Sequence, residues 1–81
     1  NGLRLQMVIL MSERPRRVGE LADEIDRAMQ TTSEHLKKLR DSDLVQAESS
    51  GTGRVYSLKR PKLVEKILEL RTYLRRDDSD E

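Results

Sequence analysis

The chain has no cysteine, tryptophan or phenylalanine, and its aromatic side chains are Tyr56 and Tyr73. Without cysteine, disulfide bonds and thiolate metal sites are excluded, which fits a protein of the reducing cytoplasm. The longest apolar run, Met7 to Met11, is far shorter than the roughly 20 residues that a membrane-spanning helix needs. We therefore expect a cytoplasmic protein with no membrane partner and with a core of Leu, Val, Ile and Met.

The length and the small aliphatic core point to one domain that gains stability from a partner. A chain of 81 residues is enough for a single small domain, and such a core is marginal on its own. This favours a second subunit. The chain begins with Asn1-Gly2 rather than with Met, which we interpret as an added N-terminus or as a piece of a longer protein.

Charge of one sign is concentrated at the C-terminal end. The net charge is only +1, but Asp77, Asp78, Asp80 and Glu81 all lie in the last five residues. Residues 1–76 keep all 16 basic side chains against 11 acidic ones, a net charge of +5. A basic body with an acidic tail is compatible with nucleic-acid binding. The tail, residues 77–81, is predicted to be disordered.

Apolar residues recur at helical spacing in the first part of the chain. The pattern predicts a helix over residues 3–11, ended before Pro15, and a short second helix over residues 19–25. A break follows at Asp26, which we expect to cap a third helix. Two short helices joined by a tight turn form the helix-turn-helix pattern.

The third predicted helix, around residues 30–39, has two different faces. Thr32, Leu36 and Leu39 fall at i, i+4 and i+7, which makes a narrow stripe that is fit to be buried. The opposite face is polar and carries Gln30, Glu34, Lys37 and Asp41, with Thr31, Ser33 and Lys38 on its flanks. Such a helix can lie in the DNA major groove with its N-terminal half on base edges. Taken alone, the same pattern also fits a solvated amphipathic helix.

A β-hairpin is predicted directly after these helices. Residues 44–49 and 54–58 read as strands, and the intervening Ser50-Gly51-Thr52-Gly53 has the chemistry of a turn. After a helix-turn-helix, such a hairpin is a wing, whose tip can reach the DNA backbone or the minor groove. The alternative is a hairpin turn with no further role.

Arginines lie beside both of these elements. Arg54 follows the hairpin turn, and Arg14, Arg16 and Arg17 form a basic elbow before the second helix. We expect them to contact phosphates. Arginines in a loop of this kind are otherwise merely solvated.

The last predicted helix, residues 61–76, carries an apolar seam. Its members, at spacings of 4, 3 and 4 as in a coiled coil, are Leu63, Ile67, Leu70 and Leu74. The helix either packs back on its own domain or pairs with a second copy. Because the preceding helices and the hairpin already form a small closed core, we expect homodimerisation through this helix, with help from Leu3 and Met7. The organisation is then a DNA-binding domain at 1–60, a dimerisation helix at 61–76 and the tail.

Residues 3–58 resemble the winged helix-turn-helix transcription regulators of the ArsR type, and the segments that carry the resemblance are VGELADEID, TTSEHLKKLRDSDLV and GTGRVYSL. The resemblance implies a mainly α fold with a small β-hairpin, in the order α-α-α-β-β-α. It also implies a symmetric dimer on a palindromic operator in double-stranded DNA, with the third helix in the major groove and the wing on the backbone. By position, the DNA-facing residues that it implies are Gln30, Thr31, Ser33, Glu34, Lys37 or Lys38, and Arg54 in the wing.

The sequence departs from this family pattern in three places. Metal-sensing members use cysteines, or histidine and acidic residues of the last helix, whereas this chain has no cysteine and its single histidine is His35. We therefore expect no metal site and no cofactor. Glu34 replaces a basic or neutral residue and can accept a hydrogen bond from a cytosine amino group. Thr32 replaces a buried aliphatic residue, and its hydroxyl can bond back to its own helix.

The leading hypothesis is a dimeric, sequence-specific regulator, most simply a repressor, that binds double-stranded DNA. The alternative is a protein-interaction winged helix without specific DNA binding, which Glu34 and the modest charge of the third helix favour. An enzyme is not expected, because the sequence has one histidine, no cysteine and no glycine-rich phosphate loop.

Overall fold

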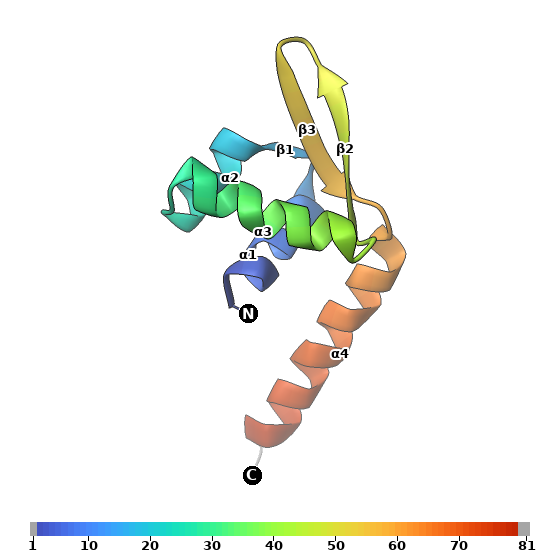
Figure 1. The fold of residues 1–81 in the computed structure, drawn as a ribbon. Coiled ribbons are helices and arrows are strands. Elements are labelled where there is room, and N and C mark those ends of the chain that lie inside the picture. Colours follow the sequence, from blue (N-terminus) through green and yellow to red (C-terminus); the bar gives the residue numbers. More distant parts are fainter. Residues whose placement is uncertain (1, 80–81) are drawn as a thin grey trace.

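The computed structural model describes the backbone of residues 2–79 and the side chains of residues 2–76. Over these residues the chain is mainly helical with a small antiparallel sheet, which confirms the predicted fold class. In chain order the elements are α1 (Gly2–Glu13), β1 (Arg16–Arg17), α2 (Val18–Ile25), α3 (Met29–Asp41), β2 (Val45–Ser50), β3 (Gly53–Leu58) and α4 (Pro61–Ser79). The hairpin rises from one end of α3, and α4 runs away in the opposite direction (Figure 1).

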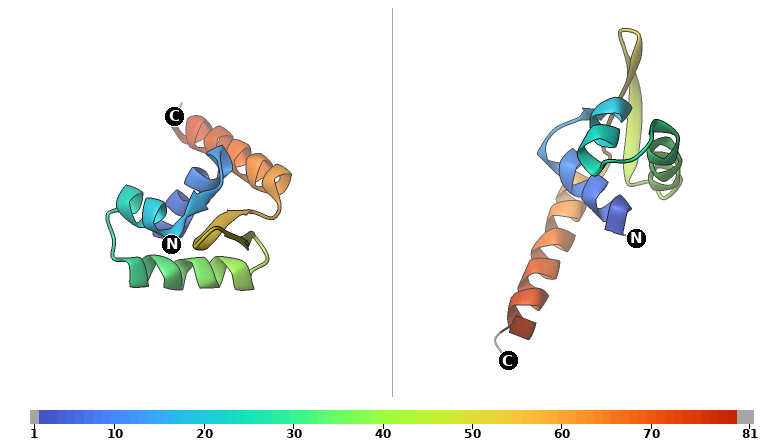
Figure 2. Two further views of the ribbon diagram at one scale, coloured as in Figure 1. Left: turned by 90° about the horizontal axis from the view of Figure 1, so that it is seen from above. Right: turned by 90° about the vertical axis from the view of Figure 1, so that its left-hand side faces the viewer.

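Helix α1 lies in the middle of the molecule, between α3 and α4 (Figure 2, left). Its apolar residues therefore face neighbours on more than one side, and Met7 is 0% exposed. Met7 was expected at a dimer interface, and that expectation is wrong, because the side chain is already enclosed by its own protomer. Leu3, the other residue of α1 assigned to the dimer, is only half-buried and packs at the edge of the core.

The core is aliphatic, as the composition predicts. Besides Met7, the largest fully buried side chains of the described residues are Leu21 of α2 with Leu36 and Thr32 of α3. The Thr32 hydroxyl donates to the carbonyl of Ala28, at 2.9 Å, which confirms that it bonds back to its own helix. The hydroxyl is the one polar group that threonine, in place of the family's aliphatic residue, brings into the core, and this bond satisfies it.

The sheet has three strands in the order β1-β3-β2. Strands β2 and β3 pair in antiparallel fashion from Val45↔Leu58 at the base to Ser50↔Gly53 at the tip. The sequence did not predict β1, in which Arg17 pairs with Val55 of β3. This third strand ties the start of α2 to the middle of β3.

The connections are built from left-handed residues. Asp26 (φ 55°) ends α2, where its backbone N–H is bonded to carbonyls of that helix. The expectation that Asp26 caps α3 is therefore wrong, and Ala28 stands at that position without a side-chain bond. Gly51 (φ 63°) forms the hairpin turn, in a conformation that costs glycine little.

Within residues 61–76, helix α4 joins the core through one side of its first turns. Val64 is 3% exposed and Leu68 packs at the edge of the core. The predicted apolar seam is left open, with exposures between 47% and 57% for Leu63, Ile67, Leu70 and Leu74. The tail assigned to residues 77–81 lies outside the described side chains, although α4 continues to Ser79. No helix within residues 2–79 is long and apolar enough to cross a bilayer.

Candidate nucleic-acid interface

Helix α3 turns its polar face to solvent. Its buried stripe is Thr32, Leu36 and Leu39, so the residues between them point outward. Of the side chains predicted to face DNA, Thr31 is half-buried and the others are exposed, namely Gln30, Ser33, Glu34, Lys37 and Lys38. The structure therefore brings all six together on one accessible surface.

The wing lies beside this surface. The hairpin rises next to α3, on the side of the molecule away from α4 (Figure 2, right). Arg54, next to the turn in β3, is exposed. The polar face of α3 and the wing arginine are thus available to one extended ligand.

The charges on α3 are only weakly compensated. The Lys37 amine lies 3.4 Å from a carboxylate oxygen of Asp41, and both side chains are largely exposed. Such a surface pair is worth little, because water and salt screen it. Within the described part of the chain, Lys38 forms no ion pair. Both lysines therefore remain available to an anionic partner.

Arg16 does not belong to this surface. Its side chain is 4% exposed, its Nε donates to the carbonyl of Leu10 at 3.1 Å, and its Nη2 lies 2.7 Å from Glu13. The Glu24 carboxylate lies 4.0 Å away. The prediction that Arg16 contacts phosphates is corrected, because its guanidinium is already desolvated and bonded inside the protomer. It instead joins α1 to α2.

The other elbow arginines surround Glu20. The Glu20 carboxylate accepts the backbone N–H of Arg17 at 2.8 Å and Arg14 Nη1 at 3.3 Å. These two hydrogen bonds, that of Arg17 first, hold the pKa of the Glu20 carboxyl below its usual value. Arg14 stays 57% exposed. Arg17 directs its side chain elsewhere, because its Nη2 donates to the carbonyl of Ser50 in the wing at 3.2 Å.

Two exposed side chains next to the predicted set were not singled out from the sequence. Met29, the first residue of α3, is 53% exposed. Arg27 lies in the turn before α3 and is held by the carbonyl of Asp26, at 2.9 Å. For Arg27 the sequence carried a signal, because a basic residue lies just before the third helix. For Met29 it carried none, because an apolar residue at the start of a helix is ordinarily expected to be buried.

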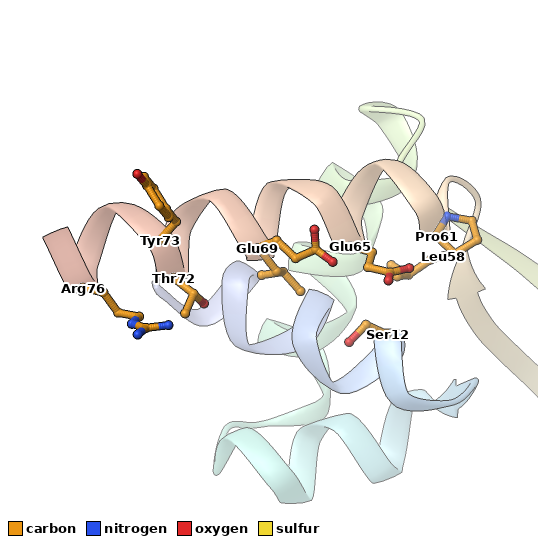
Figure 3. A pocket seen from close by; sticks show the side chains of 9 residues that line it. Ser12, Leu58, Pro61, Glu65, Glu69, Thr72, Tyr73 and Arg76 are labelled. Atoms are coloured by element: carbon orange, nitrogen blue, oxygen red, sulfur yellow. The ribbon is translucent and has the colours of Figure 1, made fainter.

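A hollow of about 530 Å³ lies between α1 and α4 (Figure 3). Its lining includes none of the residues predicted to face DNA and consists of Ser12, Leu58, Pro61, Glu65, Leu68, Glu69, Thr72, Tyr73 and Arg76. Among residues 2–76, no group of three His, Asp or Glu side chains comes close enough to hold a metal ion. The predicted DNA-facing surface on α3 and the wing is separate from this hollow.

Helices packed on an aliphatic core, with a hairpin beside the exposed polar face of the third, define a winged helix-turn-helix domain, a DNA-binding fold. The sequence profile described as "Bacterial regulatory protein, arsR family" matches residues 1–47, which is more than half of the chain. The chain therefore belongs to the arsR family of transcription regulators. This confirms the resemblance seen in the sequence.

Known proteins agree with this assignment. The chain is 32% identical over 63 residues to the uncharacterized HTH-type transcriptional regulator MJ0229 of Methanocaldococcus jannaschii, covering 73% of this chain but only 66% of that protein, just under two thirds. It superposes on Mycobacterium tuberculosis Rv0081 with a TM-score of 0.88 and 31% identity, over 99% of this chain and 81% of the other. The Mycobacterium bovis domain Mb0332, described as a homodimeric winged helix-turn-helix DNA-binding domain, gives a TM-score of 0.88 at 23% identity, over 100% of this chain and 75% of the other. The last likeness concerns the fold alone.

Proposed function

We propose that this chain binds double-stranded DNA sequence-specifically as a homodimer and represses transcription, with α3 in the major groove and the wing on the flanking backbone. The observation that carries the proposal is the exposed polar face of α3 beside Arg54, on the side of the molecule away from α4. A DNA duplex can approach this surface without meeting the apolar seam of α4. Repression needs nothing beyond occupancy of the operator.

Base recognition is assigned to the N-terminal half of α3. Gln30 and Ser33 are exposed and Thr31 is half-buried, and their amide and hydroxyl groups both donate and accept hydrogen bonds. Each good bidentate contact to a base edge discriminates by about 1–3 kcal/mol. Glu34 accepts from the amino group of cytosine in this arrangement, which predicts a preference for cytosine at one position of each half-site.

Phosphate contacts are assigned to cations around this centre. Lys38 of α3 and Arg54 of the wing are exposed and, within the described residues, form no ion pair. Arg17 is exposed and reaches the wing through the carbonyl of Ser50, and Lys37 of α3 and Arg14 before α2 are further exposed cations. Cations of this kind supply affinity and orientation rather than sequence information.

The homodimer is assigned to the apolar seam of α4. Leu63, Ile67, Leu70 and Leu74 are each about half exposed, and a continuous exposed apolar patch marks an interaction site. The Mb0332 domain, which has the same fold, is described as homodimeric. A twofold axis through α4 places two copies of α3 on a palindromic operator, with half-sites about 34 Å apart.

The experiment is selection of duplexes from a random library, followed by affinity measurements on the selected site. Lys37→Ala with Lys38→Ala removes two cations from α3, and Lys62→Ala with Lys66→Ala removes the same charge from α4. We expect the first pair to weaken DNA binding at least tenfold with the dimer intact, and the second pair to leave it near wild type.

The same experiment separates the second candidate function, a protein-interaction winged helix. Glu34 and Asp41 favour this candidate, because they place two carboxylates on the polar face of α3 and carboxylates repel phosphates. If the selection enriches no sequence and both double variants behave alike, the DNA-binding proposal is wrong and the interaction module is favoured.

A further inference from the structure

The tip of the wing extends beyond the part of the sheet that β1 supports. Strand β1 reaches only as far as the pair Arg17↔Val55. From there to the turn, Ser49↔Arg54 and Ser50↔Gly53 pair as a ribbon of two strands. A two-stranded ribbon exposed to water is marginally stable by itself. The segment that presents Arg54 therefore needs further support to keep one orientation.

The side chain of Arg17 continues the support where its backbone stops. Its Nη2 donates to the carbonyl of Ser50 at 3.2 Å, across 33 residues of sequence. The other end of the guanidinium lies over Gly53, since a Cβ built there would come within 2.7 Å of Nη1. The guanidinium thus touches both strands at the last pair before the turn.

Gly53 provides the space for this contact. Its φ is not positive, unlike that of Gly51, so its backbone conformation is open to alanine. The group that an added Cβ would meet is the Arg17 guanidinium. An alanine here would therefore displace the Arg17 guanidinium rather than strain the backbone.

The backbone of Arg17 is fixed from two sides, by its pairing with Val55 of β3 and by the start of α2. Its N–H donates to Glu20 Oε1 at 2.8 Å, which is half of a capping box at the start of α2. An arginine side chain has no acceptor with which to complete the box. The side chain is consequently free of the cap and reaches the wing from a fixed base.

We propose that Arg17 is a positioning residue of the wing: its guanidinium, seated over Gly53 and bonded to the Ser50 carbonyl, holds the hairpin tip in the orientation in which Arg54 meets the DNA backbone. We call this contact of the Arg17 guanidinium with Ser50 and Gly53 the brace. Its effect on DNA binding rests on the proposed function, but the brace itself is a property of the free protein. Arg17 has a phosphate to contact only when DNA is bound, whereas the brace acts before binding.

The test compares Arg17→Ala, Gly53→Ala and the double variant, with Arg71→Ala on α4 as the charge-matched control. The first readout is the backbone ¹⁵N order parameter of residues 50–54 without DNA, which reports motion on the picosecond to nanosecond timescale. We expect it to fall in Arg17→Ala and in Gly53→Ala and to be no lower in the double variant. Arg71→Ala is expected to match wild type.

The second readout is affinity for the selected duplex. Gly53→Ala keeps every charge, so a direct phosphate contact alone predicts no loss. With the brace, we expect a loss of about two- to tenfold, the range of one hydrogen bond. Arg17→Ala loses more, because it also removes a cation. Adding Gly53→Ala to it costs nothing further, since the displaced group is already absent.

The outcomes separate this inference from the proposed function. If Gly53→Ala leaves either the order parameters of residues 50–54 or the DNA affinity unchanged, the brace is overturned, even if Arg17→Ala weakens binding. If the losses of DNA affinity in the two single variants simply add in the double variant, the brace is also overturned. If the wild-type protein binds no duplex at all, the proposed function fails, while the order parameters still decide whether Arg17 holds the wing.

Discussion

Leu70→Ala tests whether the apolar seam of α4 forms a dimer. Leu70 is 57% exposed in the protomer, and full burial of a leucine side chain is worth about 1.5–3 kcal/mol. Covering the exposed part in a dimer therefore stabilises each copy by about 1 kcal/mol once the retained Cβ is subtracted. Two copies per dimer give about 2 kcal/mol of stabilisation, and Leu70→Ala, which removes it, should raise the dimer dissociation constant about 30-fold.

Sedimentation equilibrium over a range of protein concentrations measures this constant directly. Glu69→Ala changes a neighbouring residue outside the seam and is the matched control. Circular dichroism at a concentration where both proteins are monomeric checks that the fold is unchanged, as expected for a side chain outside the core cluster. A dissociation constant for Leu70→Ala within twofold of wild type would refute dimerisation through this face.

Two further predictions concern residues that hold the domain together. Asp43 bonds Lys59 and Arg60 at 2.7 and 2.6 Å, and these bonds, that of Lys59 first, lower the pKa of its carboxyl below the usual 3.8. The stability it contributes is then present above the unfolded pKa and is lost as the pH falls through the lower folded value. Asp43→Asn should therefore lower the free energy of unfolding at pH 7 and have progressively less effect below about pH 4. Urea titrations that give the same difference between variant and wild type at about pH 7 and about pH 2.5 would contradict this. Arg16→Ala should lower the free energy of unfolding by about 2–3 kcal/mol, because it leaves the Leu10 carbonyl without its charged donor; chemical denaturation checks this, and a loss below about 0.5 kcal/mol would show that the buried guanidinium contributes little.

The helices and the hairpin were predictable because their apolar residues repeat with the period of each element. The stripe on α3 places Leu36 inside and Lys37 outside whatever surrounds the helix, so the polar surface followed from spacing alone. The seam on α4 followed in the same way. Glycines at positions 51 and 53 marked the hairpin turn.

The errors fall where spacing carries no information. Strand β1 has two residues, too few to display a period. Arg16 and Arg17 are adjacent, yet one is buried against α1 and the other reaches the wing, a division that depends on carbonyls and carboxylates supplied by other elements. Met7 lies on a helix that is apolar nearly all round, so its sequence does not tell which face meets the core. Asp26 stands between two helices and suits the end of one as well as the start of the next.

The most direct test is the dependence of DNA affinity on salt. Arg17, Lys38 and Arg54 give three phosphate contacts per protomer in the proposed complex and six per dimer. Each releases counterions, so the logarithm of the binding constant for the selected duplex should fall with the logarithm of salt concentration with a slope of about −5. A slope near zero, or no binding by the intact dimer at about 50 mM salt, would contradict the assignment of α3 and the wing to double-stranded DNA.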